Sequence, residues 1–281
     1  MSPDTFRKFD LSGRTALVTG GATGIGYFIS RALAKSGAKV MVAARREAVL
    51  KEGMERLLCD CPNAEFLYET VDLADRKSVH ALASSATQRM GGVDIFVGNA
   101  GQDCLQLIGD IEDDTIDYML QMNVAANISL VRRFLPHMRK QRWGRVLFSS
   151  SVTSIAASAH EGLGVYTAAK GGLNAFTRTA AVETGHDRIT FNSIVIGFFL
   201  TDIVREAAAH LDQHQGKGAG KALLTSLSSM SALGRPCECE EIEGLVQLLA
   251  SDAGSAMTGT NTVIDGGMSV MLRPRQPPDS N

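Results

Sequence analysis

The glycines that follow the first predicted strand have the spacing of a phosphate-binding turn. They lie in the segment Thr19–Gly26, between an apolar run and a helical pattern. Glycines at this spacing allow a tight turn, close approach of the backbone to a pyrophosphate, and tight packing of the next helix on the strand. The start of that helix offers free N–H groups to the phosphates. The alternative is a purely structural turn. The predicted pyrophosphate site consists of Gly20, Thr23, Gly24, Ile25 and Gly26.

Two arginines follow the second predicted strand, where the adenosine ribose of a dinucleotide would lie. Arg45 and Arg46 come directly after Ala44. A site that prefers NAD commonly places a carboxylate here, which accepts a hydrogen bond from the ribose 2′-hydroxyl. This sequence has no carboxylate at that position, and two guanidinium groups can neutralise and bind a 2′-phosphate. The arginines therefore favour NADP(H). NAD(H) remains the alternative if both are only solvated charges at a helix start.

Apolar runs that alternate with amphipathic stretches must position these residues. The predicted strands are 14–19, 39–44, 65–71, 93–97, 145–149, 190–195 and 261–264. The predicted helices are 25–36, 47–58, 77–90, 165–184 and 240–251. The stretch 114–138 is expected to form one or two helices, with Pro136 marking a kink or an end. Such alternation implies parallel pairing through right-handed crossovers, and continuous apolar runs imply a sheet covered on both faces. The sequence therefore predicts an α/β fold, a Rossmann-type doubly wound parallel β-sheet flanked by helices.

No linker, repeat or low-complexity segment divides the 281 residues, so residues 1–281 are expected to form a single NAD(P)-binding domain. The exception is a stretch at about 198–232, where Gly216–Gly220 interrupts a helical pattern. This stretch is expected to be a mobile insertion that covers the substrate. The tail from about residue 273 is rich in proline and is expected to be loose.

The overall composition excludes several classes of protein. The net charge is −2, with 44% hydrophobic and 21% charged residues, as in ordinary globular proteins. This charge provides no basic surplus for binding nucleic acid or a membrane surface. No apolar run approaches the ~18 residues of a transmembrane helix, and the N-terminus lacks the apolar run of a signal peptide. A cytoplasmic location is expected.

The cysteines form two closely spaced pairs and one single residue. Cys59 and Cys61 are one pair, Cys237 and Cys239 the other, and Cys104 stands alone. An odd number without a secretion signal favours free thiols in a reducing compartment. The pairs invite a zinc interpretation, but each lies beside acidic residues, with no C-x-x-C or pair of histidines at zinc-ligand spacing. No metal site is expected.

The order of these and further motifs resembles the short-chain dehydrogenase/reductase family, in its single-domain branch. The resemblance extends from about residue 12 to residue 271, and each motif lies at a predicted strand end or on the helix after it. The matching features are the Thr19–Gly26 turn, Asp72, Gly98–Gly101, Asn123, Ser151, and the run Tyr166-Thr167-Ala168-Ala169-Lys170. No single match is specific, but their joint order is.

The resemblance assigns a catalytic role to four of these residues. Tyr166 and Lys170 are four residues apart on a helix and share one face. A neighbouring ammonium is expected to lower the pKa of the tyrosine, which delivers a proton to the substrate as the cofactor delivers hydride. Ser151 is expected to donate a hydrogen bond to the substrate oxygen. Asn123 resembles the family's helix-kink asparagine, which positions a water in a proton relay with Lys170.

The choice of Ser151 among neighbouring serines depends on alignment with the family's strand pattern. Ser149 and Ser150 lie beside it, and the gap of 15 residues from Ser151 to Tyr166 is longer than usual. The extra residues fall near His160, which is expected to be a solvated loop residue that borders the substrate.

The resemblance also implies further cofactor contacts. Asp72 is expected to accept from the adenine amino group, with the Leu73 backbone alongside, and Lys170 to hold the nicotinamide ribose. One departure is Ile196, which stands before Gly197 where the family usually has proline and puts the geometry of this loop in doubt. The remaining implied contacts are Asn99, Ala100 and Gly101 beneath the adenosine, Tyr166, and Gly197 and Thr201 at the nicotinamide.

Three functions are consistent with these residues. The first is an NADP(H)-dependent carbonyl reductase or alcohol dehydrogenase for a lipophilic or ring-bearing ketone or alcohol, because apolar side chains are expected to line the site. The alternative is that these side chains only pack the lid or a contact between subunits. The second is a 3-oxoacyl-(acyl-carrier-protein) reductase, for which a basic cluster would dock the acidic carrier. The third is a non-catalytic cofactor-binding sensor, against which the complete set of catalytic residues argues. The family also implies a homo-oligomer, a tetramer or dimer. The apolar residues are Cys104, Leu105, Leu107, Phe198, Phe199, Leu200, Leu223, Leu224 and Leu227, and the basic ones Arg132, Arg133, Arg139, Lys140, Arg142 and Arg145.

Overall fold

A seven-stranded parallel sheet forms the middle layer of the computed structural model, which describes residues 6–157, 161–214, 216–272 and 274. The strand order is β3-β2-β1-β4-β5-β6-β7. The order reverses between β1 and β4, and ligands of such sheets bind at the carboxyl ends of the strands near this switch point. The predicted doubly wound parallel sheet is confirmed. The strands are β1 Thr15–Thr19, β2 Lys39–Ala44, β3 Phe66–Thr70, β4 Ile95–Gly98, β5 Gly144–Ser151, β6 Ile189–Ile196 and β7 Asn261–Ile264.

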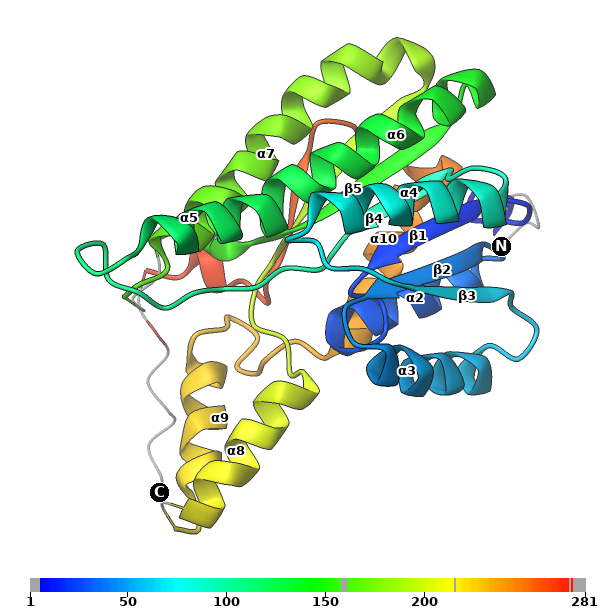
Figure 1. Cartoon of the computed structure of the whole chain (residues 1–281). Coiled ribbons are helices and arrows are strands. Elements are labelled where there is room, and N and C mark those ends of the chain that lie inside the picture. Colours follow the sequence, from blue (N-terminus) through cyan, green and yellow to red (C-terminus); the bar gives the residue numbers. More distant parts are fainter. Residues whose placement is uncertain (1–5, 158–160, 215, 273, 275–281) are drawn as a thin grey trace.

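Helices cover both faces of this sheet (Figure 1). One face carries α2 (Gly24–Lys35), α3 (Glu47–Asp60) and α10 (Glu243–Ala250). The opposite face carries α4 (Arg76–Met90), α6 (Ala126–Gln141) and α7 (Gly164–Thr184). Among the described residues, no helix is long and apolar enough to cross a membrane.

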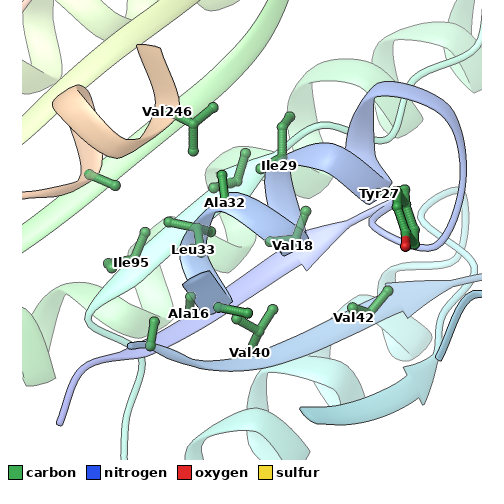
Figure 2. Close-up of a cluster of buried hydrophobic side chains, with 14 of the residues drawn as sticks. Ala16, Val18, Tyr27, Ile29, Ala32, Leu33, Val40, Val42, Ile95 and Val246 are labelled. Carbon is green, nitrogen blue, oxygen red and sulfur yellow. The ribbon is translucent and has the colours of Figure 1, made fainter. Parts of the chain in front are cut away.

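Successive residues of each central strand enter different apolar layers. Ala16 and Val18 of β1 pack with Leu33 of α2, and Figure 2 shows this layer. Leu17, between them, packs on the opposite face with Phe134 of α6. Because both faces are buried, the strands appear in the sequence as continuous apolar runs rather than as alternating patterns.

The helical region between β4 and β5 contains two helices, as the sequence allowed, but they are divided at an unexpected place. The chain forms α5 (Asp113–Leu120), a π-helical turn (Gln121–Ala125) and α6. Pro136 lies inside α6, which continues to Gln141, so of the two outcomes expected there, a kink or an end, the helix end is wrong. The helix ends instead where the next residue, Arg142, adopts a left-handed conformation with φ of 53°. The interruption lies at the π-helical turn, which contains Asn123.

The stretch that interrupts the fold before the last helix forms a hairpin of two helices, α8 (Asp202–His214) and α9 (Ala219–Ser229). Figure 1 shows this α8–α9 hairpin extending from the sheet as a separate arm. The helices approach closely at Gly220, where a Cβ atom would lie 2.2 Å from the carbonyl oxygen of Ala208. The predicted loose tail from residue 273 lies outside the described residues, except for residue 274.

Candidate active site

The turn between β1 and α2 has the conformation that its glycines predict. Gly20 and Gly24 have positive φ angles of 66° and 51°. A Cβ atom on Gly26 would lie 2.0 Å from the carbonyl oxygen of Gly20, so the turn and the helix pack too closely for a side chain there. This is the cradle that a dinucleotide pyrophosphate requires, with the N-terminus of α2 facing it.

A cavity of about 190 Å³ lies beside this turn, at the ends of β1 to β4. Arg45 and Arg46 are exposed at its edge, and neither has an ion-pair partner within the described ranges. Residues predicted to contact the adenosine half also line the cavity. They are Gly20, Thr23, Asp72, Leu73 and Ala100.

Asn99 connects this cavity to the catalytic side. Its side-chain amide donates to the carbonyl oxygens of Thr19 and Gly20, at 3.1 and 3.3 Å. Its side-chain oxygen accepts from the Ser149 hydroxyl at 3.0 Å. The hydroxyl of Thr19 in turn accepts from the backbone N–H groups of Asn99 and Ala100, both at 3.1 Å. These bonds hold the ends of β1, β4 and β5 in a fixed relation.

Three segments bring the predicted catalytic residues together. Lys170 lies under Tyr166, with its Nζ 5.6 Å from the ring centroid. A Cβ atom placed on Gly101 would lie 2.9 Å from both Lys170 Nζ and Asn123 Oδ1, so this glycine leaves room for the two polar groups. Ser151 ends β5 and hydrogen-bonds with Tyr166. Asn123, Ser151, Tyr166 and Lys170 thus converge from the π-helical turn, β5 and α7.

The Asn123 side chain has specific partners that explain its place in a π-helical turn. Its amide donates to the carbonyl oxygens of Met119 and Gln102, at 3.0 and 3.1 Å, and its Oδ1 accepts from the Gln102 N–H at 3.3 Å. The Asn127 amide donates to the Asn123 carbonyl oxygen at 2.8 Å. Asn127 and Gln102 were not predicted from the sequence as partners of Asn123. The sequence does carry a signal for Asn127, because its spacing of four from Asn123 places both side chains on one helix face.

Burial controls the protonation of the two central groups. It raises the pKa of Tyr166, and the hydrogen bond with Ser151 opposes this effect. It lowers the pKa of Lys170 to about 8. The predicted lowering of the tyrosine pKa by Lys170 is not found, because burial lowers the pKa of Lys170 to about 8, so that it loses its charge before Tyr166 ionises. The Lys170 amine donates to the Ser149 carbonyl oxygen at 2.7 Å.

Replacing Lys170 by methionine is expected to stabilise the cofactor-free protein near neutral pH. The folded pKa of about 8 lies below the ordinary 10.5, so the unfolded chain binds more protons between these values. The free energy of unfolding of the wild type therefore rises between pH 8 and 10.5. As the pH falls through 8, Lys170 becomes charged in the folded protein and this gain in stability is lost. At about 1.4 kcal/mol per pKa unit, the variant should gain about 3 kcal/mol near pH 7 and almost nothing at pH 10.5. Urea unfolding at both pH values measures this, and an equal difference at the two would contradict it.

The remaining predicted residues lie at the ends of β6 and β7. Gly197 donates its N–H to the Ile264 carbonyl at 3.0 Å, and its Cα packs against Asp265. Ile196 pairs in register with Ser151 and Ile264, so the strand continues where a proline would remove a hydrogen-bond donor. The Thr201 methyl lies 3.8 Å from the Cβ position of Gly24, next to the turn. His160 lies outside the described residues.

The cysteine pairs do not gather into a metal site in the part of the chain that the structure describes, where no three potential ligands meet. Cys237 and Cys239 are buried, and burial raises the pKa of both thiols, that of Cys239 to about 11.

Comparison with known proteins identifies the family. Residues 14–212 match the model of the family described as short chain dehydrogenase. The chain belongs to the short-chain dehydrogenase family. This dehydrogenase is therefore an oxidoreductase, and the similarity extends well beyond the matched range, as its relatives show.

Two relatives are similar to this dehydrogenase over nearly their whole length. A 3-oxoacyl-(acyl-carrier-protein) reductase of Pseudomonas aeruginosa is 33% identical, covering 92% of this chain and 98% of the relative. A D-beta-hydroxybutyrate dehydrogenase of Rhizobium meliloti is 28% identical, covering 90% and 98%. Among solved structures, L-sorbose reductase of Gluconobacter frateurii, complexed with NADPH and L-sorbose, is 28% identical, with a TM-score of 0.88 over 94% of this chain and 100% of that one.

Proposed function

We propose that this dehydrogenase interconverts a ketone and a secondary alcohol with NADP(H), and that Tyr166 is its acid–base group. The convergence of Ser151, Tyr166 and Lys170 beside the glycine turn carries this proposal. The relatives named above support the reaction class, because their names describe dehydrogenases and reductases of hydroxyl and oxo groups.

Each residue of the proposed site has a distinct role. A nicotinamide cofactor, when bound, supplies the hydride. Tyr166 donates its hydroxyl proton to the substrate oxygen, and Ser151 donates a second hydrogen bond to the same oxygen. A tyrosine whose pKa is raised by burial is protonated at neutral pH, so it is prepared to act as an acid in reduction. Lys170 holds the nicotinamide ribose, and Asn123 orders the water that returns the proton.

The chain's own residues favour NADP(H) over NAD(H). Arg45 and Arg46 are exposed at the edge of the adenosine cavity, where they can bind a 2′-phosphate. Asp72, the nearest acidic group along the cavity, accepts from the backbone N–H of Ala74 at 2.9 Å. The NADPH complex of L-sorbose reductase agrees with this choice. Asp72 and Leu73 would then contact the adenine, Asn99 to Gly101 would lie beneath the adenosine, and Gly197 and Thr201 would face the nicotinamide.

Reduction of carrier-linked 3-oxoacyl substrates is the second candidate, supported by the similarity to the Pseudomonas reductase. Half of the basic cluster is already paired within the chain, whereas Arg132, Arg133 and Lys140 are exposed. Arg145 is buried and pairs with Asp252, and Arg139 and Arg142 both pair with Asp187. Arg139 also lies about 24 Å from Asn123 along the helix, at 1.5 Å per residue. Free ketones are therefore the better substrates to test first.

The test is ketone-dependent oxidation of NADPH over a panel of neutral, anionic and carrier-linked ketones. We expect oxidation with NADPH and a free ketone, with formation of the matching alcohol. Turnover of carrier-linked substrates alone would favour the second candidate. Tight binding of NADPH without oxidation by any ketone would refute the proposal and indicate a cofactor-binding sensor.

A further inference from the structure

We propose that Asp103 and Glu161 make the substrate site select uncharged ketones and exclude ketones that carry a carboxylate. This inference rests on the function proposed above and names the class of substrate within it. The two carboxylates lie on separate loops, which contact each other through the backbones of Gln106 and Gly162, four residues before Tyr166 in the chain. For brevity, residues 102–108 are called the entrance loop, and Glu161 to Leu163 the pre-helix loop.

The start of the entrance loop is fixed against the catalytic residues. Gly101, just before it, packs against Lys170 Nζ and Asn123 Oδ1. Gln102 exchanges two backbone hydrogen bonds with the Asn123 side chain, and its own side-chain oxygen accepts from the Tyr118 hydroxyl at 3.2 Å. Asp103 is the next residue. Its Cα is therefore within about 7.6 Å of the Gly101 Cα, at 3.8 Å per residue.

The end of the entrance loop is fixed against the pre-helix loop. The Gln106 N–H donates to the Gly162 carbonyl oxygen at 3.1 Å. A Cβ atom on Gly162 would lie 2.7 Å from the Gln106 nitrogen, so the two loops touch through their backbones. Glu161 precedes this contact directly, and Tyr166 follows it in the first turn of α7. Asp103 lies between the two fixed points of the entrance loop. Burial is the main cause of the raised pKa of Tyr166, and the negative charge of Asp103 makes a smaller contribution in the same direction.

The negative charge at this entrance is not neutralised by the described residues. Asp103 and Glu161 are both exposed, and neither has an ion-pair partner in the described parts of the chain. Lys170 is buried, with 4% of its surface exposed, and its ammonium donates to the Ser149 carbonyl. Within the described residues of these two loops, a carboxylate on the substrate would therefore meet two like charges and no cation to bind it. Like charges placed together repel, and this repulsion disfavours binding of an anionic substrate.

The cations of the α8–α9 hairpin do not change this balance. Arg205 is paired with Glu238 at 2.9 Å. Lys217 and Lys221 lie at the tip of the hairpin, where α8 and α9 join, and Figure 1 places this tip at the far end of the arm. The hairpin also carries two further carboxylates, Asp202 and Glu206, on α8.

The entrance loop offers apolar groups to an uncharged substrate. Leu105, Leu107 and Ile108 are 68%, 50% and 97% exposed. Apolar side chains bind uncharged groups of a ligand but give no compensation for removing water from a carboxylate. Charge and apolar surface on one loop thus favour the same class of substrate.

The test compares acetoacetamide with acetoacetate, which have nearly the same shape and differ by one negative charge. In the wild type with saturating NADPH, we expect kcat/KM to be about tenfold or more higher for the amide. In Asp103→Asn this ratio should fall severalfold, because one of the two repelling charges is removed. Raising the ionic strength should lower the wild-type ratio, since exposed charges are screened, and change the Asp103→Asn ratio less. The matched control is Asp110→Asn, an exposed aspartate beyond the same loop, which should leave the ratio unchanged.

The outcomes separate this inference from the function on which it rests. A ratio near one, a preference for acetoacetate, or equal ratios in Asp103→Asn and the wild type would overturn the charge selection while ketone reduction stands. Loss of NADPH oxidation with every ketone of the panel would instead refute the proposed function. If another ketone is reduced but neither of this pair, their inhibition constants against that ketone replace the ratio, with the same expected order. Calorimetric binding of 3-hydroxybutyramide and 3-hydroxybutyrate to the NADPH complex gives a readout without turnover, and the amide should bind more tightly.

Discussion

Replacing Tyr166 by phenylalanine is expected to lower kcat for ketone reduction by about 10³-fold, within the range for removal of a general acid. The substitution removes one oxygen atom and retains the ring that covers Lys170 Nζ at 5.6 Å. Cofactor affinity, measured by fluorescence titration with NADPH, should therefore change little. The ratio of the two effects distinguishes a lost proton donor from a damaged fold.

The matched control for this substitution is Tyr68→Phe. Tyr68 lies on β3, in the layer beneath α3. Its replacement removes the same hydroxyl oxygen at a position far from α7. It should retain wild-type kcat. Near wild-type turnover in Tyr166→Phe would contradict the proposed mechanism, because phenylalanine has no hydroxyl proton to donate to the substrate oxygen.

The second large effect is expected from replacing Arg45 and Arg46 together by alanine. Each guanidinium can form a charge-assisted hydrogen bond with a 2′-phosphate, which contributes about 1.5–3 kcal/mol. Loss of both should weaken NADPH binding by about 10²-fold or more, while NADH, which lacks this phosphate, should lose at most severalfold. Parallel fluorescence titrations with the two cofactors measure the difference.

A suitable control is Arg132→Ala, an exposed arginine on α6 that does not line the adenosine cavity. It should leave both affinities unchanged. Equal losses for NADPH and NADH in the double variant would show that the arginines are solvated charges that stabilise the helix start. The preference for NADP(H) would then have no support from this part of the chain.

Much of the fold is predictable because both faces of the sheet are buried. The strand predicted at 39–44 matches β2 at both ends, since a short continuous run of apolar residues is typical of a strand buried on both faces. The π-helical turn was not predictable. Its residues, Gln121–Ala125, are ordinary helix formers, and the turn contains bonds from Asn123 to Gln102, which lies 21 positions earlier in the chain.

Some features of the candidate site could likewise be predicted from the sequence, and others could not. The positions of Tyr166 and Lys170 on one face of α7 follow from their spacing, and the structure places both at the end of β5. The direction of the tyrosine pKa does not follow from spacing. It depends on the burial of both side chains, which raises the pKa of Tyr166 and lowers that of Lys170. This burial exists only once β5 and α7 are packed together.

The central claim is that this dehydrogenase transfers hydride from NADPH to a ketone carbon while Tyr166 supplies the proton. A single-turnover reaction with NADPH dideuterated at C4 of the nicotinamide tests it most directly, with the alcohol product analysed by mass spectrometry. The account predicts one deuterium on the carbinol carbon with the wild type, and about 10³-fold slower incorporation with Tyr166→Phe. An alcohol without deuterium, or equal rates of incorporation in the two proteins, would contradict it.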